Sequence, residues 1–280
     1  MAEEMQTLEE NHTWTIEELP AEKKPINCKW VYRVKYKSDG SIERYKARLI
    51  VRGDHQVKGF DFHETFAPVA KMTSVRVFLL VIVAKGWDLH QMGVNNAFLH
   101  GDMKKEVYMK IPSGFYSSGP TCVHWLHKSL YGLRQAPRQW FVKLSSELED
   151  YGFVRSYADY SLFTYKKGDV FMGLLVYVDN IILAGNDTST YQLFKEYLNE
   201  CFHIQDLGQF KYFLGIEVAY GSKGLFLCQC KYALEIGEEC GLLGGKPAAT
   251  PLEENYKLAL ASGDLFTDPS QYCRLVGRLI

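Results

Sequence analysis

The residues best suited to catalytic chemistry lie between two apolar segments in the second half of the chain. Residues 174–178 and 181–184 are apolar and rich in β-branched side chains, and the polar pair Asp179–Asn180 separates them. This pattern predicts a β-hairpin with Asp179 at its tip. Asp-Asn pairs are also common in ordinary turns, because both residues tolerate a left-handed backbone. A carboxylate held on a rigid hairpin would equally suit a metal ligand.

A second group of functional side chains lies on a strand predicted at residues 42–51. Arg44, Lys46, Arg48 and Arg52 occur at even spacing, so their side chains are expected to share one face. A cationic face suits contact with phosphate groups. Charged side chains also protect exposed edge strands from unwanted pairing. The spacing of these charges alone favours neither phosphate binding nor edge protection.

The seven cysteines offer no metal site that the sequence identifies. Their number is odd and the chain has no recognisable secretion signal, so we expect free thiols. Cys228 and Cys230 with Cys240 lack the spacing of a zinc site, and His124 and His127 lie far away in sequence. The sequence therefore argues against zinc.

Composition limits the possible classes of protein. The chain has 280 residues, of which 47% are hydrophobic, enough for a sizeable core. Its net charge of −1 gives no general basic surface, so a nucleic-acid partner would need a local patch. The longest apolar run, residues 77–84, is too short to span a bilayer, and the acidic N-terminus does not resemble a signal peptide. We expect an intracellular protein without a membrane span.

Helices mixed with many hairpins must position these residues. Helices are expected at residues 2–11, 73–85, 137–150, 188–201 and after 231, and strands at 28–36, 42–51, 87–94, 106–111, 122–127, 210–219 and 225–228. Thr73 or Ser74 and Thr188 or Ser189 are the expected N-caps, and residues 12–20 are expected to be a break. The order of elements predicts an α+β fold with an antiparallel sheet.

Six segments together resemble the reverse transcriptase domain of copia-type LTR retrotransposons, particularly those of plants. In chain order they read KWVYRVKYKSDGSIERYKARLIVRG, ETFAPVAKMTSVR, GWDLHQMGVNNAFLHGDMKKEVYMKIPSGF, KSLYGLRQAPRQW, LLVYVDNIILAG, and DLGQFKYFLGIEV followed by KYALE. They cover nearly the whole chain from about residue 11. Six motifs in the family's order are a very specific signal.

The resemblance implies a right-hand polymerase that copies RNA into DNA with two magnesium ions. The implied partners are an RNA template, a DNA primer and deoxynucleoside triphosphates, and the implied location is a cytoplasmic retroelement particle. The oligomeric state is not implied. The expected division is an N-terminal helix and lead-in at 1–20, fingers at 21–75 and 101–136, a palm at 76–100 and 137–220, and an incomplete, truncated thumb at 221–280.

The catalytic positions depart from the family pattern. Its three metal-binding aspartates correspond to Gly93 in MGVNNAF and to Asp179 and Asn180 in YVDN. Asp179 is the one carboxylate left at these positions. A carboxylate in contact with a divalent ion contributes several kcal/mol, and each ~1.4 kcal/mol is a factor of ten in rate. We therefore expect a polymerase fold without polymerase activity.

The resemblance assigns roles to further residues. Lys46 and Arg48 would hold the incoming triphosphate, Phe98 would select deoxynucleotides, and Gln135 would lie along the nucleotide and template. Leu214–Gly215 matches the primer grip. The structural alternatives are core packing for Phe98 and a capped loop for Gln135.

Three functional hypotheses follow. The first, which ranks highest, is a catalytically inactive reverse transcriptase domain. The second is a module that binds primer–template without turnover. The third is an unselected pseudogene product that does not fold stably. The family's polyprotein also holds integrase, protease and RNase H domains, so we expect this chain to be a fragment of it.

Overall fold

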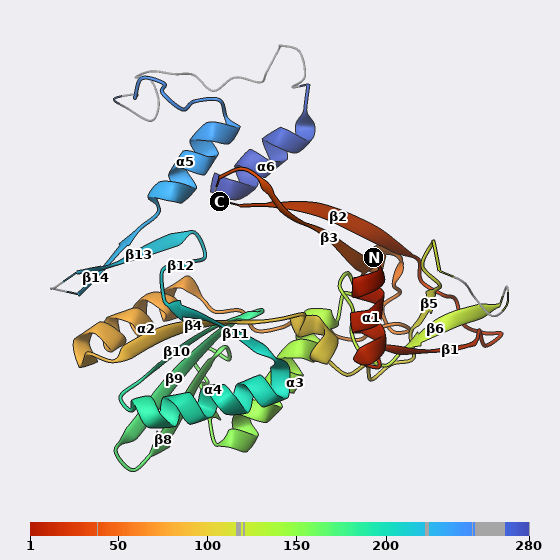
Figure 1. The fold of residues 1–280 in the computed structure, drawn as a ribbon, viewed down its shortest axis with the longest axis horizontal. Helices are drawn as coiled ribbons and strands as arrows, with labels where there is room; N and C mark the ends of the chain where they lie inside the picture. The colour runs from red at the N-terminus through yellow and green to blue at the C-terminus, as the bar shows by residue number, and fades with distance from the viewer. Residues whose placement is uncertain are drawn as a thin grey trace. The chain divides into compact units, whose positions relative to one another are not determined.

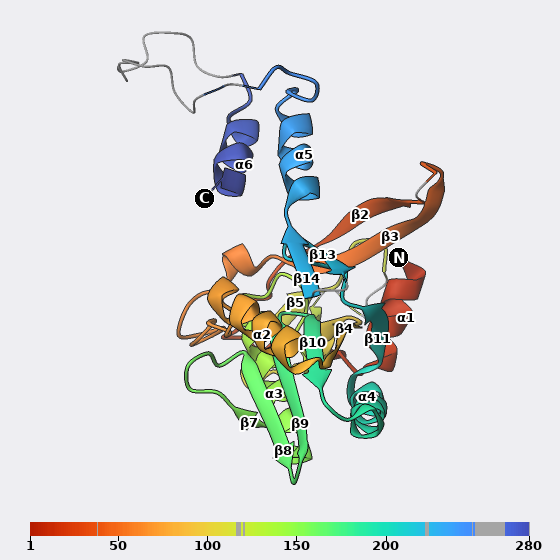
Figure 2. The ribbon, with the colours of Figure 1, turned by 90° about the vertical axis from the view of Figure 1, so that its left-hand side faces the viewer.

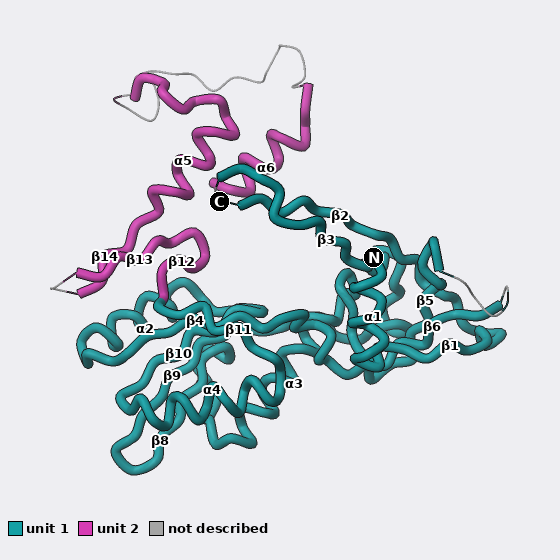
Figure 3. Tube along the Cα trace, in the orientation of Figure 1, with its two compact units in different colours: residues 1–209 teal, residues 210–280 magenta. Residues whose placement is uncertain are grey.

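The structure, a computed structural model, describes residues 1–37, 39–115, 119, 121–221, 224–247, 249 and 267–279. The chain divides into two compact units, residues 1–209 and 210–280, and each is described by itself (Figure 3). Helices alternate with antiparallel strands throughout, so the predicted α+β class is confirmed.

A six-stranded antiparallel sheet with the order β11-β4-β10-β9-β8-β7 is the centre of the first unit (Figure 1). The two apolar segments predicted as a hairpin form its middle strands, which explains their nearly continuous burial. The six strands are Ile204–Gln209 (β11), Asp88–Val94 (β4), Asn180–Gly185 (β10), Val170–Tyr177 (β9), Leu162–Lys167 (β8) and Val154–Arg155 (β7).

Helices cover both faces of this sheet (Figure 2). The main hydrophobic core lies where Ala136–Tyr151 (α3) and Thr188–Phe202 (α4) pack against one face. On the opposite face lies Met72–Lys85 (α2), whose Phe78 ring would come within 2.6 Å of a Cβ on Gly173. A glycine at this position in β9 therefore lets α2 approach the sheet closely.

A second core lies under a three-stranded sheet with the order β1-β6-β5. Its strands are Trp14–Glu18 (β1), Cys122–Leu126 (β6) and Tyr108–Lys110 (β5), and Ala2–Glu10 (α1) packs on this core. Residues 12–20 were predicted to lack regular secondary structure. This prediction was wrong, because β1 lies there. Its residues are mostly exposed and are fixed by pairing with β6, a distant segment that local pattern cannot reveal.

The cationic strand belongs to a two-stranded hairpin that Figures 1 and 2 show as an extended ribbon. Cys28–Tyr36 (β2) and Ile42–Val51 (β3) have the predicted bounds. Arg52 does not share the cationic face, because it follows the end of β3 and its guanidinium binds the carboxylate of Asp54 at 2.6 Å. A short 3₁₀ helix at Gly53–His55 (η1) follows β3, and another at Ala97–His100 (η2) follows β4.

The described part of the second unit contains a small antiparallel sheet and two helices. Tyr212–Phe213 (β12), Ile216–Gly221 (β13) and Gly224–Cys228 (β14) pair in that order. Cys230–Glu239 (α5) and Pro269–Leu279 (α6) are its described helices. No described helix in either unit combines the length and hydrophobicity that crossing a bilayer requires.

The predicted N-caps were wrong at two helices. Lys71, not Thr73 or Ser74, is the N-cap of α2, and its N–H donates to the Asp159 carboxylate at 3.1 Å. Asp187 is the N-cap of α4, and its carboxylate accepts from the N–H of Thr190 at 2.7 Å. Asp187 thus caps the first turn of α4 with its side chain, whereas in α2 Asp159 binds the N–H of the N-cap residue itself.

Two glycines let the end of β3 contact the loop that precedes α3. A Cβ on Gly132 would lie 2.1 Å from the Val51 carbonyl oxygen, and one on Gly53 would lie 2.0 Å from the Gly132 carbonyl oxygen. The N–H of Val51 donates to the Tyr131 carbonyl at 2.8 Å. This close approach places Tyr131 beside the cationic hairpin.

Replacing Gly132 by alanine tests this contact. Gly132 has φ +93°, and its new methyl group would overlap backbone atoms, so we expect a loss of at least ~3 kcal/mol in the free energy of unfolding. Gly40→Ala is the matched control, because Gly40 has φ +82° with nothing within 4 Å, and it should cost about 1–2 kcal/mol. Urea unfolding measures both, and equal losses would contradict the role of the contact.

Candidate active site at the β9–β10 hairpin

Asp179 lies at the tip of the central hairpin, as the sequence predicts, but the turn is displaced by one residue. Tyr177 ends β9 and pairs with Asn180, the first residue of β10, so the two turn residues are Val178 and Asp179. The break was expected at Asp179 and Asn180. Val178 has φ +55°, a conformation that β-branched residues rarely adopt.

Two hydrogen bonds hold the backbone of this turn. The indole Nε1 of Trp140 donates to the Val178 carbonyl at 2.7 Å, and the N–H of Val94 donates to the Asp179 carbonyl at 2.8 Å. Trp140 is buried in the main core, with 1% of its surface exposed. The strained conformation of Val178 is therefore maintained by the packed core beneath it.

The three positions that the resemblance aligns with metal-binding aspartates meet at this turn. Gly93 in β4 pairs directly with Asn180 in β10, and Asp179 precedes Asn180 at the exposed tip. The Asn180 amide donates to the Asp179 carboxylate at 3.2 Å, and its oxygen accepts from the Gln91 amide at 3.5 Å. Positions distant in sequence thus form one small polar cluster.

This cluster does not fit two divalent ions. Hard cations such as magnesium need several oxygen ligands, and here one carboxylate faces a glycine and an amide. Within the described residues, no group of three acidic, histidine or cysteine side chains close enough to share an ion includes Asp179. The amide nitrogen of Asn180 also occupies one oxygen of that carboxylate.

An aromatic and cationic cluster lies near the turn. The Arg48 guanidinium is 4.5 Å from the ring centre of Tyr131, and the Phe98 ring centre is 5.0 Å from that of Tyr131. Burial raises the pKa of Tyr131, the positive charge of Arg48 opposes the rise, and the negative charge of Asp179 adds to it. The sequence pattern did not mark Tyr131 as a candidate site residue. Its position directly before a glycine was the one available signal, and only the structure shows how tightly this glycine is packed.

The cationic face of the hairpin is larger than β3 alone indicates. Arg33 pairs with Lys46, Lys35 pairs with Arg44 and Lys29 pairs with Ile50, so β2 contributes three further cations to the same face. Partial burial lowers the pKa of Lys46, and the neighbouring charges of Arg48 and Arg44 lower it further. The Nε atom of Arg48 is buried without a hydrogen-bond partner among the described residues. This face is thus rich in positive charge, and the Nε–H group of Arg48 is a hydrogen-bond donor without an acceptor among the described residues.

Gln135 and the primer-grip pair lie in structural turns. Gln135 is 3% exposed, its oxygen accepts from the Gln56 amide at 2.9 Å, and its nitrogen donates to the Asp61 carbonyl at 3.3 Å. Leu214 and Gly215, in the second unit, have φ +51° and +78° and connect β12 to β13. Their assigned contacts with nucleotide and primer stay predictions.

Replacing Trp140 by phenylalanine tests the support of the turn. Losing the bond to the Val178 carbonyl should cost about 1–3 kcal/mol in the free energy of unfolding and weaken amide hydrogen-exchange protection in β9 and β10. Trp30→Phe is the control, because its indole bond, to the Ser113 carbonyl, is longer at 3.3 Å and lies outside this sheet. Unchanged protection of the hairpin in the Trp140 variant would contradict the assignment.

Comparisons with known proteins agree with the motifs. The family model described as reverse transcriptase (RNA-dependent DNA polymerase) matches residues 11–254. The retrovirus-related Pol polyprotein from transposon RE1 of Arabidopsis thaliana is 42% identical over 271 residues, 96% of this chain and 18% of that protein. The Pol polyprotein from transposon TNT 1-94 of Nicotiana tabacum is 40% identical over 263 residues, 92% of this chain and 20% of that protein.

This chain spans about a fifth of the length of these relatives. Among solved structures, the foamy viral protease–reverse transcriptase in complex with double-stranded DNA is similar with a TM-score of 0.40 and 12% identity, over 86% of this chain and 39% of that chain. The family predicted from the six sequence segments is confirmed by the family model and the plant relatives. The chain belongs to the reverse transcriptase family, in the group found in Pol polyproteins of plant copia-type transposons.

Proposed function

We propose that this chain is a reverse transcriptase domain that has lost polymerase activity through two positions, Gly93 and Asn180. The observation that carries the proposal is their direct pairing across β4 and β10 beside Asp179. The geometry groups the three positions, while the residue types leave a single carboxylate among them.

The two substitutions bear on the metal ions that the family uses. Two magnesium ions at one site need carboxylates to neutralise their charge and to position the primer hydroxyl and the triphosphate. Losing two carboxylates removes several kcal/mol of transition-state stabilisation at each position. Because each ~1.4 kcal/mol is a factor of ten in rate, the expected loss is many orders of magnitude.

The backbone at the turn has room for the missing side chains. A Cβ on Gly93 would meet the Leu207 Cδ1 atom at 3.6 Å, an ordinary contact. Aspartate has the shape of asparagine, and its oxygen would still accept the bond from Gln91 at position 180. The proposed loss of activity thus comes from missing metal ligands, while the backbone that would position them is intact.

Primer extension on an RNA template with magnesium tests this proposal. We expect no extension by the chain as it stands and measurable extension by the double variant Gly93→Asp/Asn180→Asp, because the three carboxylates are then restored. Adding Asp179→Asn to the double variant is the control and should abolish the activity. Extension by the unmodified chain, or silence of a folded double variant, would contradict the proposal.

A second candidate function is binding of primer–template without turnover. The cations that Arg33, Lys35, Arg44 and Lys46 place on one face support it, as does the unpartnered Nε atom of Arg48. Phosphate contacts of this kind supply affinity without requiring metal ions. An RNA template, a DNA primer and a nucleotide are the partners that we propose.

The salt dependence of binding to an RNA–DNA hybrid measures this second function. Arg44→Gln/Lys46→Gln should weaken binding and reduce the slope of log K against log salt by about two, roughly one for each lost phosphate contact. Lys166→Gln/Lys167→Gln removes the same charge from β8 and should leave the slope unchanged. Equal effects of both double variants would show that only net charge matters.

We also propose the subdomain division of the family for this chain. The strands of the six-stranded sheet fall within residues 76–100 and 137–220, which we assign to the palm. The two smaller sheets of the first unit fall mostly within residues 21–75 and 101–136, which we assign to the fingers. Residues 221–280 would begin the thumb, and the place of action would be a cytoplasmic retroelement particle.

A further inference from the structure

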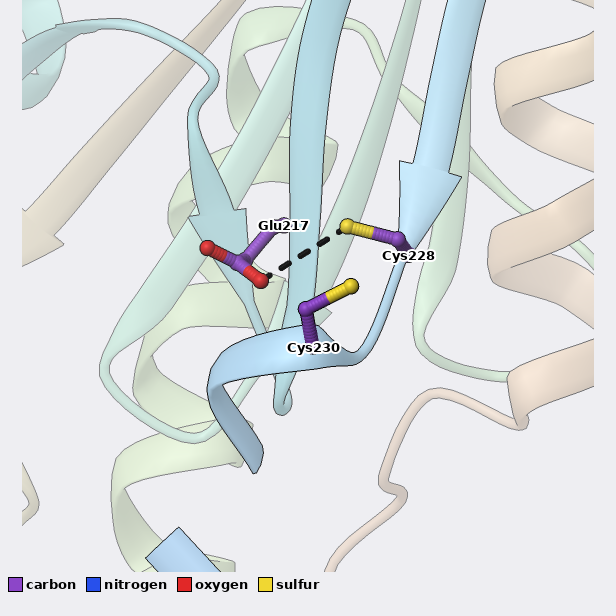
Figure 4. A group of neighbouring side chains, drawn as sticks. All are labelled: Glu217, Cys228 and Cys230. Carbon is purple, nitrogen blue, oxygen red and sulfur yellow. Dashed lines mark hydrogen bonds between the residues drawn. The ribbon is translucent and has the colours of Figure 1, made fainter. Parts of the chain in front are cut away.

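Three possible metal ligands meet in the second unit, far in sequence from the catalytic positions. Glu217 lies on β13, Cys228 ends β14 and Cys230 begins α5, and their side chains converge (Figure 4). One ligand atom from each lies within 4.8 Å of the other two. The pairing of Glu217 with Cys228 places both on one face of the hairpin, and Cys230 follows after one residue.

We propose that Glu217, Cys228 and Cys230 bind a thiophilic divalent cation of the zinc type. Thiolate sulfur and carboxylate oxygen are ligands that zinc prefers, and three protein ligands leave a fourth position for water. Cys230 is exposed, so this fourth position is open to solvent. The proposal does not depend on the polymerase assignment, because none of these residues takes part in it.

The distance between Cys228 and Glu217, which are joined by a hydrogen bond, is close to that of two ligands in a tetrahedral site. With Zn–S of about 2.3 Å and Zn–O of about 2.0 Å, a tetrahedral site separates sulfur from oxygen by roughly 3.5 Å and two sulfurs by roughly 3.8 Å. The Cys228 Sγ atom is 3.6 Å from the Glu217 Oε2 atom. The N–H of Lys231 donates to the same oxygen at 2.9 Å, which orients the carboxylate.

Binding must displace the protons of both thiols. Each cysteine would lose one proton to solvent as its metal–sulfur bond forms, so the ion is taken up against two protons. Affinity should therefore fall as pH falls, because protons compete with the metal for the two sulfurs.

A bound ion would compensate for a small core. Among the described residues of the second unit, the buried hydrophobic side chains are those of Phe210, Phe213, Ile216 and Val218, and α5 has none. Small units that bury little apolar surface are often stabilised by a metal. An ion at this site would join β13, β14 and the first turn of α5.

The spacing of Cys228, Cys230 and Cys240 in the sequence argues against zinc, and the site proposed here has Glu217 in place of Cys240. Cys240 is the C-cap of α5, at the opposite end of the helix from Cys230. Glu217 lies 11 residues before Cys228, a spacing without a recognisable motif. Only the register of β13 and β14 brings the carboxylate to the sulfurs.

Titration with cobalt tests the site, with the protein reduced, stripped of metal and then freed of chelator. We expect one equivalent of Co²⁺ to bind, with a sulfur-to-cobalt charge-transfer absorption that Zn²⁺ abolishes by displacing the cobalt. Cys228→Ser and Cys230→Ser should each weaken binding by at least ~100-fold, because a thiolate ligand is lost. Glu217→Gln should weaken it by roughly 10-fold or more.

Two matched variants serve as controls. Cys240→Ser removes a cysteine from the other end of α5, and Glu235→Gln removes a carboxylate from the middle of this helix, so both should bind cobalt as the unmodified chain does. Circular dichroism of each metal-free variant checks folding. A measurement on the unmodified chain does not depend on whether the variants fold. In this chain, zinc should slow alkylation of Cys228 and Cys230 but not of Cys273.

The outcomes separate the alternatives. No thiolate–cobalt absorption in the reduced chain, or alkylation of both cysteines that zinc does not slow, would overturn the proposal. Wild-type affinity in a folded Cys228 or Cys230 variant would overturn it as well, as would loss of binding in the Cys240 variant. Loss confined to the three ligand variants, with protection of the two thiols, would establish the site.

Discussion

The central turn of the first unit depends on hydrogen bonds to its two carbonyls. Val178 adopts a left-handed backbone conformation that its branched side chain disfavours. Trp140, from the buried face of α3, and Val94, from the neighbouring strand β4, donate the bonds that hold it. The strain at the tip of the hairpin is thus balanced by core packing, and this balance fixes where Asp179 lies.

Because of this dependence, the position of the turn does not rest on the side chains at positions 93 and 180. The turn is positioned by backbone bonds and by a buried indole, none of which involves the side chains at positions 93 and 180. Gly93 lies in an antiparallel strand with space beside it, and the Asn180 side chain has the same shape as that of aspartate. Changes at these positions alter ligand chemistry and leave the packing that forms the fold.

The two units differ in how many apolar side chains their described residues bury. In the first, two clusters of buried apolar side chains lie between helices and sheets. In the described part of the second unit, few apolar side chains are buried, and α5 contributes none. A cation held by Glu217 and two cysteines would supply there the cross-linking that packing supplies elsewhere.

Local sequence signals were enough to identify the family and most of the helices and strands. Six motifs specified the reverse transcriptase family, and alternation within β2 and β3 gave their bounds, because these signals depend on neighbouring residues. The tertiary structure decided what depends on distant partners. Pairing with β6 created β1, and strand register added Arg33 and Lys35 to the cationic face. The same cause brought Glu217 to Cys228: which residues face each other across a hairpin depends on its register, and the register depends on the type and length of the turn.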